Sequence, residues 1–167
     1  MRRVVADTGP LLHLSEIQAG ELLLCFGSVQ ATPVVLDEFG RHWPEFVRAT
    51  HPSWLIAVPV STEATDLANQ WLSAGLLDAG EAEALAHAKV ESADLFLTDD
   101  AAARTLAESI GVESRGTLGV VLFAAAVGKL GEAEANRTLD DLENRSTLWM
   151  SSRVKQASRE AIAAIFG

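Results

Sequence analysis

Three aspartates follow two predicted strands of this sequence. Asp7 comes directly after the short predicted strand Arg3–Ala6, and Asp99 and Asp100 come after the predicted strand Asp94–Thr98, which is apolar apart from its ends. In open parallel sheets, ligands bind at the carboxyl ends of the strands. We therefore expect these carboxylates to meet at one edge of a sheet, where they could do chemistry together.

Two glutamates lie on helices that such a sheet would bring to the same edge. Glu38 lies on the helix predicted after the second strand, and Glu81 opens the helix before the strand that ends at Asp99. Mg²⁺ and Mn²⁺ prefer carboxylate oxygens and water as ligands. Two such ions can activate water and stabilise the leaving oxygen in phosphodiester hydrolysis. The acids therefore predict a hard-cation site that suits a nuclease.

Helical geometry selects Glu81 rather than Glu83 for this site. At about 100° per residue, the two side chains point about 200° apart, so only one of them can face the site. Glu81 shares its face with Leu85 and Ala88, which we expect to pack inward. Glu83 shares a face with His87, one turn later, and these two are expected to form an exposed pair.

Each acid also has a structural interpretation. Asp7 could be a turn residue or a helix cap, and Asp99 or Asp100 could cap the next helix. Glu81 could be a first-turn carboxylate favoured by the helix dipole, and Glu38 could lie on a solvated face. The place of Asp7, directly after a buried strand in a chain with several other strand-end acids, favours the functional interpretation of the set.

The composition is that of one globular domain. The chain has 167 residues, of which 49% are hydrophobic and 22% charged, and a chain of this length can bury a core without disulfides. Its single cysteine, Cys25, has no partner and is expected to be a buried, inert thiol. We expect a cytoplasmic protein, because Asp7 comes too early for a signal peptide and the apolar run Val120–Val127 is too short to cross a bilayer.

The formal charge of −10 argues against a nucleic-acid partner, since such binders are usually basic. Two divalent ions held by the acids would neutralise about four of these charges and leave the chain acidic. Affinity for RNA would then have to come from the ions and from local patches of the surface.

Strands alternate with helices along the chain, which predicts an α/β fold with a mostly parallel central sheet flanked by helices. Strands are expected at 3–6, 29–31, 94–98 and 112–114, with an extended piece at 55–60. Helices are expected at 10–17, 21–26, 33–40, 62–74, 81–91, 99–110, 117–127, 132–144 and 151–166. Thr32 and Thr62 are the expected caps of the third and fourth helices, and 41–53 is the least regular segment.

Taken in order, five segments resemble the PIN-domain family, and within it the small prokaryotic proteins related to VapC-type toxins. They are VVADTGPLL at 4–12, PVVLDE at 33–38, LDAGEAEA at 77–84, LTDD at 97–100 and GTLGVVL at 116–122. The resemblance spans essentially the whole chain. It implies a three-layer fold in a single domain, 1–167, whose C-terminal helices at 131–167 pack on the domain or form a partner surface.

The resemblance also implies a set of acids that holds Mg²⁺ or Mn²⁺. By position, Asp7 matches the first acid, Glu38 the second and Glu81 the third, where many relatives have aspartate. The fourth is Asp100 by the common Thr-x-Asp pattern, with Asp99 as a possible substitute. Thr8 matches a hydroxyl residue that often supports the metal site, and Thr98 opens the Thr-x-Asp pattern as a second supporting residue.

The function implied by the resemblance is that of an endoribonuclease, commonly a toxin held inactive by a co-encoded antitoxin and often a homodimer. Cleavage of DNA rather than RNA stays open, because the same metal cluster serves both. The alternative is a PIN-like module that acts by docking a protein, with the helix at 151–166 as its partner surface. A receiver-like signalling domain ranks low, since Lys89 and Lys129 are misplaced for one.

Other residues could hold RNA or form rival sites. Arg41, Arg48 and Arg104 could contact the RNA backbone, and Trp43 and Trp54 could stack bases. The four histidines lack paired spacing, and a single cysteine gives no zinc signature. The sequence has neither a nucleophile elbow nor a glycine-rich phosphate loop.

Overall fold

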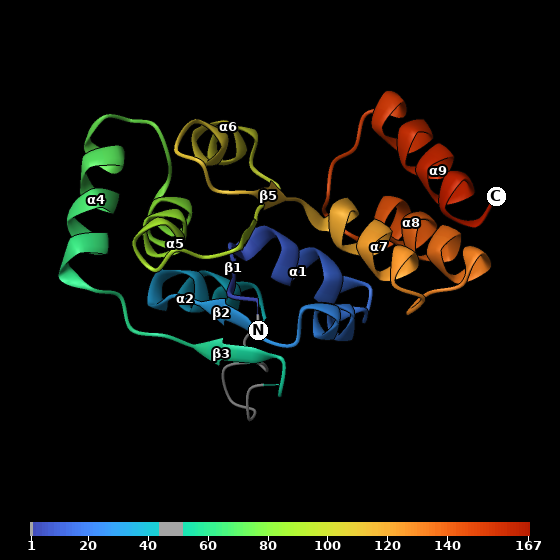
Figure 1. The fold of residues 1–167 in the computed structure, drawn as a ribbon, viewed down its shortest axis with the longest axis horizontal. Coiled ribbons are helices and arrows are strands. Elements are labelled where there is room, and N and C mark those ends of the chain that lie inside the picture. The colour runs from blue at the N-terminus through green and yellow to red at the C-terminus, as the bar shows by residue number, and fades with distance from the viewer. Residues whose placement is uncertain (1, 44–51) are drawn as a thin grey trace.

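The centre of the protein is a parallel sheet, shown in Figure 1 for a computed structural model that describes residues 2–43 and 52–167. Within these residues the sheet has five strands, in the order β3-β2-β1-β4-β5, and every neighbouring pair is parallel. The strands are β1 (Val4–Ala6), β2 (Val29–Ala31), β3 (Leu55–Ala57), β4 (Leu95–Leu97) and β5 (Ser114–Arg115). From β1 the chain adds β2 and then β3 toward one edge of the sheet, and from β4 it adds β5 toward the other edge. The direction of winding therefore reverses between β1 and β4.

Helices cover both faces of the sheet, as the α/β prediction required. They are α1 (Thr8–Glu16), the 3₁₀ helix η1 (Gly20–Phe26), α2 (Pro33–His42), α4 (Thr62–Ser73), α5 (Ala79–Val90), α6 (Ala101–Ser109), α7 (Thr117–Ala126), α8 (Glu132–Arg145) and α9 (Ser152–Phe166). In Figure 1, α4, α5 and α6 lie on one side of the strands, and α1 and α7 lie on the other. Helix α2 contacts both α1 and α5.

Two cores hold these layers together. The first surrounds β1 and β4, whose residues are completely buried, as expected for strands covered on both faces. The second is built by α7, α8 and α9 around Val121, Leu139, Leu142 and Ile162. Helices α8 and α9 therefore pack on α7 through an apolar interface of their own.

The predicted elements are found, but several of their ends were wrong. The first helix begins at Thr8, not Pro10, with Asp7 as its N-cap. The helix after β4 begins at Ala101 because Asp100 is its N-cap, and the cap of α4 is Ser61 rather than Thr62. Side chains that cap a helix lie just outside it, and sequence patterns do not separate a cap from a first turn.

Two expectations about composition can be compared with the structure. Cys25 is only partly buried, although burial still raises the pKa of its thiol. Among the described helices, none has the length and apolar character needed to span a membrane.

The packing of the second core predicts how much a truncated side chain should cost in stability. Ile162 of α9 is fully buried, whereas Ile165, one turn later, is 38% exposed. Ile162→Ala should lower the free energy of unfolding by about 2–5 kcal/mol, because it leaves a cavity between three helices. Ile165→Ala is the matched control and should cost less than about 1 kcal/mol. Urea denaturation measures both, and equal losses would show that α9 is not packed as described.

Candidate active site

The first aspartate sits where the winding of the sheet reverses, between the carboxyl ends of β1 and β4. The backbone N–H of Asp7 donates to the carbonyl of Leu97 at 2.8 Å, which extends the β1–β4 pairing by one residue. The hydroxyl of Thr98 donates to Asp7 Oδ2 at 2.9 Å, and the N–H of Thr8 donates to Oδ1 at 2.7 Å. In sheets of this kind such a reversal marks the ligand-binding crevice.

Burial makes the Asp7 carboxyl an unusual acid. The residue is 5% exposed, and burial raises its pKa to about 7 despite the hydrogen bonds from Thr8 and Thr98. The negative charges of Glu81 and Glu38 raise the pKa further. An ionised carboxylate here is therefore costly unless a positive charge compensates it.

Glu38 reaches the same edge from α2. The hydroxyl of Thr8 donates to Glu38 Oε2 at 2.7 Å, so the predicted supporting role of Thr8 has a physical basis in this contact. The glutamate lies against Gly80 of α5, where a Cβ atom would stand 2.8 Å from both Cδ and Oε1 of Glu38. A larger residue at position 80 would therefore displace the Glu38 carboxylate from this place.

Glu81 lies in the first turn of α5, which begins at Ala79 rather than at Glu81 as predicted, and its charge interacts with Glu38. Its Oε2 accepts the backbone N–H of Asp78 at 3.0 Å in a capping box. Burial raises the pKa of Glu81, and the charges of Asp100, Asp78 and Glu38 raise it further. The structural and functional interpretations of Glu81 are thus compatible, since a capping carboxylate still has free lone pairs.

Asp100 completes the group and caps α6. Its Oδ1 accepts the N–H of Ala103 at 2.7 Å, and its own N–H donates to the hydroxyl of Thr98 at 3.2 Å. Charge interactions link Asp7 to Glu38 and Glu81, and link Glu81 to Asp100. The fold therefore brings four of the five predicted acids into one region of negative charge.

Asp99 is directed elsewhere. Its Oδ2 contacts His13 Nδ1 at 2.7 Å and accepts the hydroxyl of Thr117 at 2.6 Å, and its Oδ1 accepts the N–H of Thr117 at 2.7 Å. Burial acts to raise the pKa of Asp99, but the hydrogen bonds with His13 and Thr117 outweigh it and lower the pKa. Asp99 ties α1 to the start of α7, and nothing in the sequence pattern pointed to His13 or Thr117 as its partners.

The prediction that Glu83 and His87 form an exposed pair on α5 was wrong. His87 is buried, with Nε2 3.0 Å from Gln30 Oε1 on β2. Glu83 accepts the N–H of Val34 at 2.9 Å and so occupies the N-terminus of α2. The side chain of Thr32, the predicted cap, makes no capping hydrogen bond, and its buried hydroxyl has no partner among the described residues.

The residues predicted to contact RNA differ in their exposure to solvent. Arg41 and Arg104 are exposed, and Arg104 Nη1 donates to the carbonyl of Thr98 at 3.3 Å. Trp43 is partly buried against the main core, and Arg48 lies outside the described residues. Trp54 is 7% exposed, so the prediction that it stacks bases was wrong.

The chemistry of the donors fits a hard divalent cation, since all four acids offer carboxylate oxygens beside a carboxyl that is costly to ionise. The side chains do not yet converge as ligands. Among residues 2–43 and 52–167, no group of three or more His, Cys, Asp or Glu is arranged to hold a metal ion. Their oxygens instead accept the local hydrogen bonds described above, such as those from Thr8 to Glu38 and from Asp78 to Glu81.

The structure is thus a three-layer α/β fold whose parallel sheet carries acids at its reversal point. A family model for the PIN domain matches residues 3–163, so the chain belongs to the PIN-domain family. PIN domains are generally nucleases and typically use divalent metal ions. Among curated proteins, none matches the chain.

The raised pKa of Asp7 predicts a pH dependence of stability. Between pH 4 and pH 7 the folded protein holds a proton that the unfolded chain has lost, so stability falls as pH rises through this range. Asp7→Asn cannot ionise and should be spared this loss. In EDTA, the variant should gain up to about 4 kcal/mol on the wild type between pH 4 and pH 8.

Urea denaturation at the two pH values measures this difference. Asp66→Asn removes an exposed carboxylate of α4 and controls for the loss of one charge. A wild type and Asp7→Asn whose stabilities run parallel from pH 4 to pH 8 would contradict the burial of the carboxyl.

Proposed function

We propose that this protein is a Mg²⁺- or Mn²⁺-dependent endoribonuclease, acting in the cytoplasm as the VapC-like toxin of a toxin–antitoxin pair and forming a homodimer. The observation that carries the catalytic proposal is Asp7, buried at the reversal point of the sheet with a pKa of about 7 and further acids around it. Such an arrangement is unfavourable for stability alone, and a bound cation would offset its cost.

In this proposal Asp7, Glu38, Glu81 and Asp100 hold the metal. A divalent ion bound there supplies activation of water and stabilisation of the leaving oxygen in phosphodiester hydrolysis. Thr98 orients Asp7 and Thr8 orients Glu38 through their hydroxyls. Asp99 acts as a positioning residue, because its oxygens are already occupied by His13 and Thr117.

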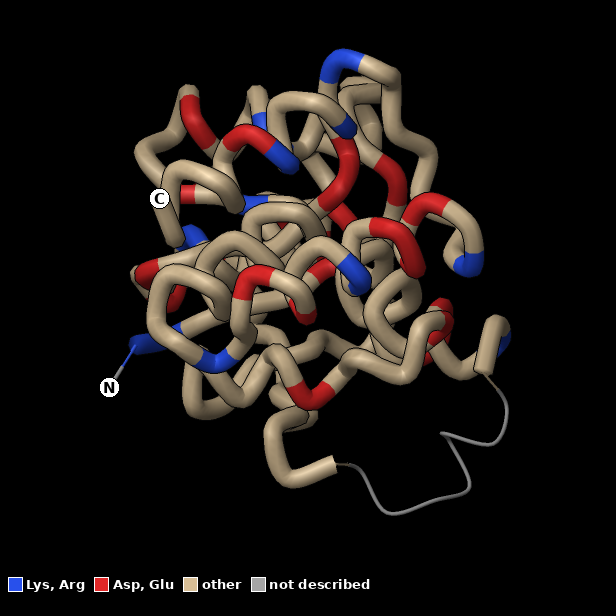
Figure 2. Tube along the Cα trace, turned by 90° about the vertical axis from the view of Figure 1, so that its right-hand side faces the viewer, with Lys and Arg blue, Asp and Glu red and all other residues tan. Residues whose placement is uncertain are grey.

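The acidity of the chain leaves little long-range attraction for RNA. Figure 2 shows Lys and Arg scattered among Asp and Glu along the described trace rather than gathered in one continuous stretch. Binding would therefore depend on the metal and on short-range contacts, such as those that the exposed side chains of Arg41 and Arg104 could offer.

A protein-docking role is the second candidate. Helix α9 exposes Val154, Ile165 and Phe166, which have no covering element among the described residues. Folded protein that binds Mn²⁺ but cuts neither RNA nor DNA would favour this role over catalysis.

Cleavage of a mixed pool of single-stranded RNA tests the proposal, with DNA of the same sequences in parallel. We expect cutting with Mg²⁺ or Mn²⁺ and none in EDTA. Asp7→Asn and Asp100→Asn should each lower the rate by about a hundredfold or more, because each removes a metal-binding oxygen.

Asp99→Asn separates the two neighbouring aspartates. It should cost about 1–3 kcal/mol of stability through the lost contacts with His13 and Thr117. Its rate, measured where the variant is fully folded, should fall less than that of Asp100→Asn. The reverse order of rates would make Asp99 the ligand, and metal-dependent cutting that survives Asp7→Asn would overturn the site.

The contact between Gly80 and Glu38 gives a second prediction. Gly80→Ala should push the Glu38 carboxylate away from Thr8 and weaken Mn²⁺ binding by about tenfold or more, as loss of a supporting contact usually does. Titration calorimetry with Mn²⁺ measures the affinity. Adding Gly80→Ala to Glu38→Ala should have no further effect, since the two changes act through one carboxylate. Additive losses would show that Gly80 matters for another reason.

A further inference from the structure

One tryptophan of this protein is placed unlike the others. Trp149 lies between α8 and α9 and is 83% exposed, whereas Trp54 and Trp71 are buried and Trp43 is partly buried. Single exposed apolar residues are common on protein surfaces and need no explanation by themselves. Trp149 differs in what it adjoins.

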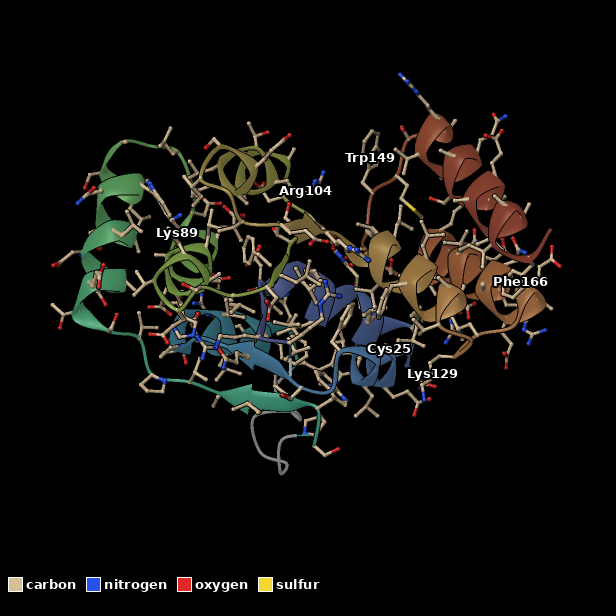
Figure 3. The ribbon with its side chains drawn as sticks, in the orientation of Figure 1. Cys25, Lys89, Arg104, Lys129, Trp149 and Phe166 are labelled. Atoms are coloured by element: carbon tan, nitrogen blue, oxygen red, sulfur yellow. The ribbon has the colours of Figure 1, made fainter. Side chains whose placement is uncertain are left out.

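Trp149 borders a groove whose lining includes Asp99 and Ala101, the two residues on either side of Asp100 in the chain. The groove has a volume of about 400 Å³ and runs from Asp99 and Ala101, beside Asp100, to Leu148 and Trp149. Its size falls in the range of about 300–1,000 Å³ found for pockets that hold small ligands. In Figure 3 Arg104 stands on α6 and Trp149 on the segment leading into α9, facing the groove from its two sides.

The two ends of the groove have different chemistry. At the end near the strands, Arg104 uses Nη1 to hold the carbonyl of Thr98. Its other N–H groups have no acceptor in the described part of the chain, and a guanidinium presents five donors in all. Asp99 also lines this end, but its oxygens are turned to His13 and Thr117. At the other end the indole of Trp149 lies beside the apolar side chains of Leu148 and Val154.

We infer that this groove is a nucleotide subsite of the proposed nuclease, in which Arg104 binds a phosphate of single-stranded RNA and Trp149 stacks on a base. The inference rests on the proposed function, since the groove starts at the residue next to Asp100. A free cation and an exposed aromatic face are the two parts from which proteins build contacts to single strands. Paired bases already stack on their neighbours, so the subsite selects unpaired RNA.

A protein partner fits the same groove less well. An apolar side chain would cover Trp149 but would leave the free donors of Arg104 without an acceptor, which is costly when they are buried. A protein would need a second, separate carboxylate side chain to pair with Arg104. A phosphodiester satisfies the guanidinium with a charged acceptor and carries a flat base within reach of the indole. The cation and the aromatic group are therefore matched by one repeating unit of RNA.

Binding without cleavage tests this subsite. The full chain is titrated with a fluorescently labelled single-stranded RNA of ten nucleotides, once in EDTA and once with Ca²⁺, a hard cation that carboxylates bind, and anisotropy gives the affinity. Trp149→Ala should weaken binding by about five- to a hundredfold, and Trp149→Phe should retain most of the affinity. Arg104→Gln should weaken binding and lower the slope of log affinity against log salt by about one.

Phe166→Ala is the matched control, because Phe166 is an aromatic residue 40% exposed at the far end of α9 and does not line the groove. It should bind as the wild type does. Equal affinities of Trp149→Ala and the wild type, or no binding by the wild type, would overturn the subsite. So would a change of oligomeric mass in Trp149→Ala with unchanged RNA affinity, which would make Trp149 a protein contact.

Cleavage kinetics with Mg²⁺ or Mn²⁺, set beside this titration, separate the subsite from the proposed function. Cleavage by the wild type with a KM unchanged in Trp149→Ala would overturn the subsite and leave the nuclease standing. Binding that depends on Trp149, together with no cleavage under any metal, would contradict the nuclease and leave the subsite standing.

Discussion

The structure depends on one unfavourable placement, a carboxyl group buried at the end of β1. Asp7 lies between β1 and β4 and accepts hydrogen bonds from Thr8 and Thr98, yet burial still raises its pKa to about 7. Hydrogen bonds of this kind recover only part of the cost of removing a charge from water. The sheet order, the threonine after each central strand and the acids on α2 and α5 all meet at this group, so the fold concentrates negative charge where it is least screened.

The sequence predicted the strands because burial on both faces leaves an uninterrupted apolar run, as in β1 and β4. It failed on α5 for a related reason. Helix α5 is buried around most of its circumference, including Ala82, Ala84, Ala86 and His87. Periodicity indicates an exposed face only where one exists, so pairing Glu83 with His87 on such a face was wrong.

The two aspartates after β4 show where local sequence stops being informative. Asp99 and Asp100 are adjacent, and both follow the strand at the edge where ligands bind. Their different orientations come from residues distant in sequence, namely His13 on α1 and Thr117 at the start of α7 for Asp99. Asp100 is fixed locally, as the cap of α6. The positions of Gly80 and Trp149 likewise depend on tertiary contacts that no spacing of residues encodes.

The hydrogen bond from Val34 to Glu83 has a consequence for how the acids can come together. It joins the start of α2 to α5, and these are the helices that carry Glu38 and Glu81. Asp7 and Asp100 belong instead to the sheet and to the turn that follows β4. The two glutamates are thus carried by two joined helices, and the two aspartates by the carboxyl edge of the sheet. A displacement of the joined helices against the sheet would therefore withdraw both glutamates at once and leave both aspartates in place.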